Sequence, residues 1–316
     1  MFDLLIHLAG VAVGLSILLS LILTLAHYPY ASDDATDLSA SKPVFDFYRN
    51  AYDRTPAVTA EAPFSTDDEY VRKARAHAST AGFPEMVASF LESCRVESGK
   101  TLEVGAGSGL LQDVTPGYVG MDISPGAGRF FHKPFVQASA TSIPFPDNSF
   151  DATWSIWVLE HIPNPGKALA EIRRVVKNGG HILIRPAWNV DPWAAEGYEV
   201  RPYSDFGWKG KLIKATIPIR LSRWYALLYA RQVRVLRTVL TALSGNPSQL
   251  QFVRLKPNYS KYWVTDSDAA VSLDFYEIYL WFTSRGDECL NCGPRNSLLF
   301  GAPGRRPEAL IIRVRK

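Results

Sequence analysis

The sequence predicts an α/β fold in which a mostly parallel sheet carries helices on both faces. Short apolar runs alternate with helical patterns between residues 100 and 187. The first of these runs ends in a glycine-rich turn, and the second ends in an acidic residue. Parallel strands need crossover connections, so strands that alternate with helices favour a parallel sheet buried on both sides.

The composition is that of a folded protein with few cysteines. The 316 residues are 47% hydrophobic and 21% charged, with a formal net charge of +3. This length suffices for one large α/β domain with an insertion. Three cysteines, Cys94, Cys289 and Cys292, argue against a disulfide framework and are compatible with a reducing compartment. The lone C-x-x-C pair lacks the second pair that a zinc site needs, so no metal is expected.

Residues 1–27 predict a membrane anchor. No residue from Leu4 to Ala26 carries a fixed charge, and a helix of this length would cross a hydrocarbon core of about 30 Å. A cleaved signal peptide is the alternative, but no Lys or Arg precedes the apolar run. We therefore expect a single-pass anchor over 1–27, followed by a linker over 28–63.

The strongest local motif begins at Thr101. A short strand over 101–104 runs into the glycine-rich turn 105–109, and a helix is expected to start near Gly109 to Asp113. Glycines let the backbone turn tightly and approach a ligand beside a helix N-terminus. Glu103, just ahead of the turn, would repel a pyrophosphate but suits a cofactor with a cationic sulfonium. A nicotinamide oxidoreductase is therefore the less favoured class.

A second strand is predicted from Tyr118 to Asp122. An acid about 20 residues after the glycine turn can accept both ribose hydroxyl protons of a nucleoside. The remaining predicted elements are strands over 152–159, 181–184, 298–300 and 310–314 and helical segments over 67–93, 168–176 and 274–284.

In this order, the motifs resemble the class I S-adenosylmethionine-dependent methyltransferases, and most closely their type-11 group. The resemblance implies a Rossmann-like fold with an antiparallel last strand, and S-adenosylmethionine as the cofactor. It implies a cofactor-binding core over 64–187, completed by the C-terminal part 263–316. The cofactor contacts expected on this basis are Glu103, Gly105, Ala106, Gly107, Asp122, Ile123, Ser139 and Ala140.

Two positions bear on activity. Ser139 stands where the family often places an Asp that hydrogen-bonds the adenine amino group, and this departure keeps a catalytically inactive scaffold open. His161 follows a predicted strand at the edge where ligands bind in open α/β sheets, so its neutral ring could act as a general base. It could instead brace the turn 163–165. Trp154 and Trp157 are expected to fill the core or line the pocket.

Residues 188–262 are predicted to form a basic, partly helical insertion over the substrate side. One helix is expected over 219–243, with arginines on one side and mainly leucines on the other. Such a helix suits a membrane interface; a core helix with a solvated arginine face and nucleic-acid binding are the alternatives. Asp266 and Asp268 could contact substrate or serve in turns and caps. The arginines on the expected basic face are Arg220, Arg223, Arg231, Arg234 and Arg237.

The expected function is methyl transfer from S-adenosylmethionine to a lipid, a lipid-linked sugar or a similar membrane-associated acceptor. A quinone, isoprenoid or other small-molecule acceptor is the alternative within the enzyme class. No nucleic acid is expected as a partner, because it would not fit the anchor. No Lys or Arg close to 1–27 sets an orientation. The domain is expected to face the cytoplasm because a soluble adenosyl cofactor is found there.

Overall fold

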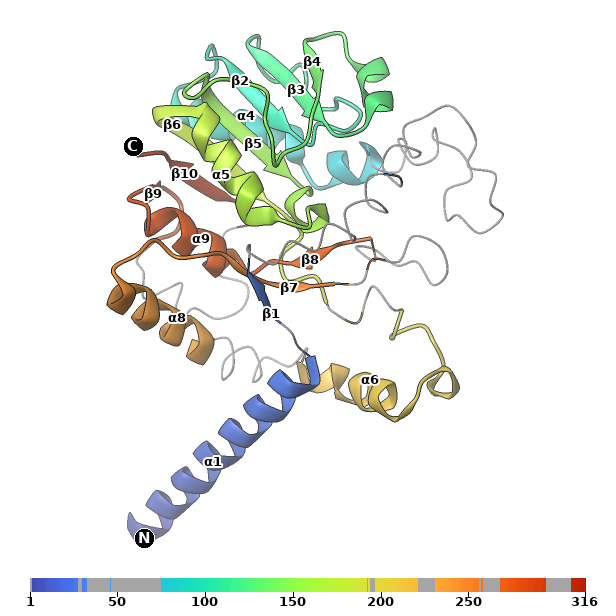
Figure 1. Ribbon diagram of the computed structural model, residues 1–316, viewed down its shortest axis with the longest axis vertical. Helices are drawn as coiled ribbons and strands as arrows, with labels where there is room; N and C mark the ends of the chain where they lie inside the picture. The colour runs from blue at the N-terminus through green and yellow to red at the C-terminus, as the bar shows by residue number, and fades with distance from the viewer. Residues whose placement is uncertain are drawn as a thin grey trace.

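A computed structural model of the chain describes residues 2–27, 30–32, 46, 75–191, 193, 197–220, 231–255, 257, 268–293 and 308–316. The strand expected over 298–300 and most of the expected linker lie outside these residues. The main sheet lies at one end of the molecule, the helices α1 and α6 lie toward the other end, and α8 lies between them beside α9 (Figure 1).

The main sheet has seven strands in the order β4-β3-β2-β5-β6-β10-β9. The strands β2 to β6 pair in parallel, and β10 is antiparallel to both β6 and β9. This confirms the mostly parallel sheet with an antiparallel last strand. The strand order reverses beside β2, which is where open α/β sheets bind ligands at their carboxyl edge. The strands are β2 (Thr101–Val104), β3 (Tyr118–Asp122), β4 (Phe135–Gln137), β5 (Phe150–Ile156), β6 (Val176–Arg185), β9 (Glu288–Cys289) and β10 (Leu310–Arg313).

Helices cover both faces of this sheet, as predicted. On one face, Phe90 of α4 belongs to the same core as Trp154 of β5. On the other face, Ile172 of α5 and Phe282 of α9 pack into a core with Leu102 of β2. Burial of these apolar faces holds the layers together. The three helices are α4 (Phe83–Cys94), α5 (Pro165–Val175) and α9 (Phe275–Thr283).

The connection from β2 to β3 departs from the prediction, because it contains turns and no helix. The backbone NH of Gly109 donates to the carbonyl of Ala106 at 2.9 Å, and that of Gln112 donates to Gly109 at 3.3 Å. The Gln112 side chain then bonds the carbonyls of Gly109 and Phe130. The connection is too short for a helix of several turns before β3 begins, so the expectation that a helix starts near Gly109 to Asp113 was wrong.

The predicted insertion contains two described helices. Helix α6 (Trp208–Arg220) begins well before the predicted start at residue 219 and carries Pro218 inside it. Helix α8 (Arg231–Ser244) matches the second half of the prediction. Residues 221–230 lie outside the described part of the chain. The short 3-10 helices of the molecule are η2 (Pro125–Phe130), η3 (Leu159–His161) and η4 (Tyr203–Asp205).

A second, three-stranded sheet joins distant parts of the chain. It consists of β1 (Tyr30–Ser32), β7 (Gln251–Arg254) and β8 (Val271–Ser272), all antiparallel. The backbone NH of Ala270, just before β8, donates to the carbonyl of Glu160 at 2.8 Å. This bond fixes the small sheet to η3, which follows β5 at the carboxyl edge of the main sheet.

The N-terminal segment forms helix α1 (Phe2–His27). Its apolar side chains, among them Leu4, Leu8 and Leu15, are exposed. Within the described residues, no helix meets the length and apolarity required to cross a bilayer. The predicted single-pass anchor is therefore not confirmed.

The C-x-x-C pair differs from the prediction. Cys289 and Cys292 form a disulfide with a Cα–Cα distance of 5.6 Å, and Cys94 is free. The sequence argued against a disulfide framework, so this pairing was not predicted; Cys289 lies in strand β9. The pairing is possible because strand β9 ends at Cys289 and the backbone bends over residues 290–292.

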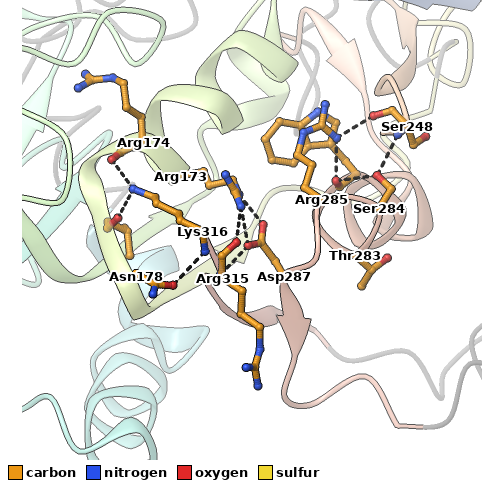
Figure 2. A network of polar contacts seen from close by, with 12 residues as sticks. Arg173, Arg174, Asn178, Ser248, Thr283, Ser284, Arg285, Asp287, Arg315 and Lys316 are labelled. Atoms are coloured by element: carbon orange, nitrogen blue, oxygen red, sulfur yellow. Dashed lines mark hydrogen bonds and ion pairs between the residues drawn. The ribbon is translucent and has the colours of Figure 1, made fainter. Parts of the chain in front are cut away.

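A polar network ties the last residues of the chain to α5 and α9 (Figure 2). The guanidinium of Arg173 donates two hydrogen bonds to Asp287, at 2.6 and 3.0 Å, and a third to the carbonyl of Arg315. The backbone NH of Arg315 also donates to Asp287, whose side chain is fully buried. The ammonium of Lys316 donates to the carbonyls of Arg174 and Val176.

The substitution Arg173→Met is expected to lower the free energy of unfolding by about 3–5 kcal/mol. It leaves the buried carboxylate of Asp287 without its cation, which is the costly way to break such a pair. Arg315→Met is the matched control: its guanidinium pairs with Glu288 on an exposed part of the surface, where an ion pair contributes little to stability. Equal losses in urea titrations of the two variants would contradict this account.

Candidate functional site

The glycine-rich turn continues β2 at the carboxyl edge of the sheet. The backbone NH groups of Gly105 and Ala106 both donate to the carbonyl of Met121 in β3, at 2.8 and 2.9 Å. Gly105 has φ +79°, which residues with a side chain rarely adopt. A Cβ at this position would lie 2.2 Å from Cγ2 of Val158, so the residue must also be small. The turn is thus held tightly between β3 and the loop after β5.

Asp122 ends β3 and contacts the turn directly. One carboxylate oxygen accepts the backbone NH of Gly107 at 2.8 Å, and the other accepts that of Ser124 at 2.9 Å. Burial raises the pKa of Asp122, while the NH groups of Ser124 and Gly107 act in the opposite direction. The sequence predicted that this acid and this turn would meet, and the structure brings them together.

Glu103 lies on the same face of the sheet but is enclosed. Its carboxyl group accepts a hydrogen bond from the hydroxyl of Tyr118, and the residue is 6% exposed. Desolvation raises the pKa of Glu103 to about 8. The carboxyl group is therefore mostly protonated at neutral pH. Through this hydrogen bond, Glu103 fixes Tyr118 against β2.

The raised pKa of Glu103 makes stability depend on pH. Between its usual value of 4.5 and about 8, the unfolded chain ionises this group while the folded chain keeps the proton. Stability is therefore lost as the pH rises through this window. The variant Glu103→Gln, which resembles the protonated form, is expected to lose less stability between these limits in chemical denaturation. The exposed Glu92→Gln should follow the original protein, and identical curves for all three proteins would exclude the effect.

The other expected cofactor residues surround this turn. The backbone NH of Ala138, after β4, donates to the carbonyl of Asp122 at 2.9 Å. This bond places Ser139 and Ala140 beside the end of β3, where Ile123 also lies. The hydroxyl of Ser139 lies 2.9 Å from that of Thr141 within its own turn. All the positions expected to contact a cofactor thus gather at the carboxyl ends of β2, β3 and β4.

His161 lies at the same edge, at the end of η3. Its Nδ1 is 3.7 Å from a carboxylate oxygen of Asp268 and 3.4 Å from the carbonyl of that residue. Its Nε2 is 3.9 Å from Glu160 Oε1, which accepts the backbone NH of Ala187 at 3.0 Å. The sequence did not predict the pairing with Asp268, because 107 residues separate the two and no local pattern links them.

Trp157 and Trp154 have different environments. Trp154 is fully buried in the core, whereas Trp157 is 40% exposed just after β5. Trp157 has φ +53°, and its ring packs edge-on against Phe83 at 4.5 Å. A bulky residue in this conformation costs about 1–3 kcal/mol and persists where the surrounding structure requires it. The strained backbone holds an exposed indole at the carboxyl edge of the sheet, next to Val158 and the glycine turn.

A Rossmann-like sheet with a glycine turn and an acid at its switch point defines the class of nucleoside-binding α/β domains. Residues 102–184 match the family model described as a methyltransferase domain, Methyltransf_11. Over these residues, the chain is thus similar to methyltransferase domains. The match covers the strands β2 to β6 and the turn between β2 and β3, apart from the first and last residues of that stretch.

Several known proteins are similar to this region. The ubiquinone/menaquinone biosynthesis C-methyltransferase UbiE of Hahella chejuensis is 35% identical over 80 residues, covering 25% of this chain and 32% of that protein. The fatty-acid O-methyltransferase of Mycolicibacterium smegmatis is 32% identical over 114 residues, covering 31% and 42%. The solved structure of YcgJ from Bacillus subtilis is 26% identical, covers 32% of this chain and 50% of its own, and has a TM-score of 0.29. The chain therefore spans half or less of the length of each of these proteins.

Proposed function

We propose that this protein transfers a methyl group from S-adenosylmethionine to a membrane-associated acceptor such as a lipid or a lipid-linked sugar. The observation that carries the enzyme assignment is the contact between Asp122 and the glycine turn at the switch point of the sheet. Asp122 would hold the ribose hydroxyls, while Gly105, Ala106 and Gly107 would lie against the cofactor. Ser139 and Ala140 would flank the adenine.

The residues present fit this cofactor. The backbone at Gly105 and Gly107 has positive φ, and any larger residue at 105 would meet Val158. The cofactor supplies an electrophilic methyl group that an acceptor nucleophile displaces in line. The protein then has to orient the acceptor, exclude water and remove a proton where the nucleophile carries one.

His161 is our candidate for the proton acceptor. A hydrogen bond from Nδ1 to the carbonyl of Asp268 would leave Nε2 unprotonated and able to take a proton from a hydroxyl or amine. Asp268 would orient the ring and stabilise the imidazolium that forms. Trp157 would contact the acceptor through its exposed indole.

The substitution His161→Gln is expected to lower kcat about 100-fold or more while leaving cofactor affinity unchanged. His132→Gln is the matched control, because His132 lies before β4 at the opposite edge of the sheet and pairs with Asp113 on the surface. Turnover would be measured with labelled methyl donor. An unchanged kcat in His161→Gln would remove the general base from the mechanism.

An apolar acceptor is favoured by two observations. The leucines and valines of α1 are exposed, so this helix would hold the domain at a membrane. The site would face the cytoplasm, because a soluble adenosyl cofactor is found there. Two of the similar proteins are named for quinone biosynthesis and for fatty acids, which are apolar acceptors. A quinone or isoprenoid acceptor is the second candidate, and an inactive scaffold is the third.

Incubation of membranes that contain the protein with labelled methyl donor, followed by lipid extraction, tests the acceptor. The proposal expects label in the lipid fraction, and less of it with His161→Gln. Label that stays in the aqueous fraction would overturn the lipid acceptor but leave the enzyme assignment intact. Failure to bind the cofactor or its demethylated product would favour the scaffold.

A further inference from the structure

Helix α8 packs onto the protein through its arginines. Arg234 bonds both carboxylate oxygens of Asp274 at 3.0 to 3.2 Å, and Arg237 bonds those of Glu277 at 2.8 and 2.9 Å. Thr238 shares a hydrogen bond with the hydroxyl of Tyr276. These partners all belong to the first turn of α9 and its cap. The basic face that the sequence suggested for a membrane surface therefore points inward in α8.

The outward face of α8 is apolar. It consists of Val235 and of the side chains one, four, five and eight positions after it, which share one side of a helix. Their exposed fractions range from 37% to 78%, which is the reverse of a surface helix on a soluble core. A contiguous apolar stripe of this kind marks an interaction surface. Its residues are Val235, Leu236, Val239, Leu240 and Leu243.

The neighbouring elements indicate what covers this stripe. Helices α1 and α6 lie toward the end of the molecule opposite the main sheet, and α8 lies beside α9 between that end and the sheet (Figure 1). Helix α1 exposes apolar side chains around its whole circumference, including Leu4, Ile6 and Leu8. A partner protein would cover one side of such a helix, whereas lipid covers all sides at once. Helix α6 adds an exposed Trp208 and several lysines but no acidic residue.

We propose that the apolar stripe of α8 inserts into the acyl region of a lipid bilayer beside α1. Trp208 and the exposed Lys209 and Lys211 then lie at headgroup level, where aromatic and cationic side chains are favoured. Lys214, by contrast, donates to backbone carbonyls of the protein. Arg234 and Arg237 are structural ties to α9 and do not contact lipid. This inference does not depend on the proposed activity, because it concerns only how the domain rests on the bilayer.

Spin labels on α8 test the contact in the full-length protein. In a Cys94→Ser background, single variants Leu240→Cys and Leu243→Cys carry a label on the stripe, and Glu92→Cys carries one on the exposed side of α4. We expect both stripe labels to lose access to a water-soluble relaxation agent and gain access to oxygen when phosphatidylcholine vesicles are added. The label at position 92 should not change.

The lipid composition of the vesicles distinguishes insertion of the apolar stripe of α8 from binding of α8 through its arginines. Insertion of the stripe should occur on neutral vesicles and persist in high salt, whereas binding through arginines would require anionic lipid. Stripe labels that stay water-accessible on vesicle-bound protein would overturn the proposal. So would a change that occurs without vesicles and depends on protein concentration, because that would assign the stripe to a second copy of the chain. None of these readouts requires cofactor binding.

Discussion

The substitution Asp122→Ala is expected to weaken binding of S-adenosylmethionine at least about 100-fold. Each hydrogen bond to a charged group contributes about 1.5–3 kcal/mol, and a carboxylate that holds two ribose hydroxyls provides two of them. The same carboxylate accepts the backbone NH groups of Gly107 and Ser124, so its loss also loosens the turn. Calorimetric titration of the purified protein measures the effect directly.

The control for this experiment is Asp113→Ala. Asp113 is an exposed acid in the same connection between β2 and β3, and its carboxylate pairs with His132 on the surface. Its removal should leave cofactor affinity unchanged. Thermal unfolding of Asp122→Ala has to show that the sheet remains folded at the titration temperature. A folded Asp122→Ala protein that binds the cofactor with unchanged affinity would contradict the assigned role.

The second large effect is expected for Gly105→Ala. The new Cβ would lie 2.2 Å from Cγ2 and 2.7 Å from Cγ1 of Val158, and the backbone has φ +79°. Left-handed backbone costs about 1–2 kcal/mol for a residue with a side chain, and overpacking adds about 1–3 kcal/mol. We expect a loss of about 2–5 kcal/mol in stability, together with loss of cofactor binding, because the turn must move.

The variant Gly179→Ala distinguishes the cost of left-handed backbone strain from the cost of steric contact with a neighbouring side chain. Gly179 has the same φ of +79°, but a Cβ there would meet nothing within 4 Å. Its substitution should cost only the strain of about 1–2 kcal/mol. Adding Val158→Ala to Gly105→Ala should restore part of the loss, a coupling that a double-mutant cycle measures. Equal losses in the two glycine variants, or strict additivity in the cycle, would show that Val158 does not close over the turn.

Much of the main sheet could be predicted because its signals are local. Each parallel strand is a short apolar run, and the polar residues at the ends of strands and helices cap them or hydrogen-bond neighbouring turns. Asp274 caps α9 by accepting the backbone NH of Tyr276, and Asp122 ends β3 next to the glycine turn. Such patterns identify the carboxyl edge of the sheet, and with it the candidate cofactor site.

The features that were missed depend on contacts between distant residues. The helical period of α8 identifies an arginine side and a leucine side, but only the acids Asp274 and Glu277 decide which side faces the protein. The pairing of His161 with Asp268 likewise depends on how the small sheet packs against η3. The helix expected after the glycine turn does not form, because the connection is short and the side chain of Gln112 donates to the carbonyl of Gly109 within it.

Cross-linking of labelled S-adenosylmethionine to the full-length protein by ultraviolet light tests the central claim most directly. The account predicts that label maps to peptides between residues 103 and 140 and that the demethylated product competes it away. Label on peptides elsewhere in the chain, or label that excess product does not displace, would contradict a cofactor site at the carboxyl ends of β2, β3 and β4.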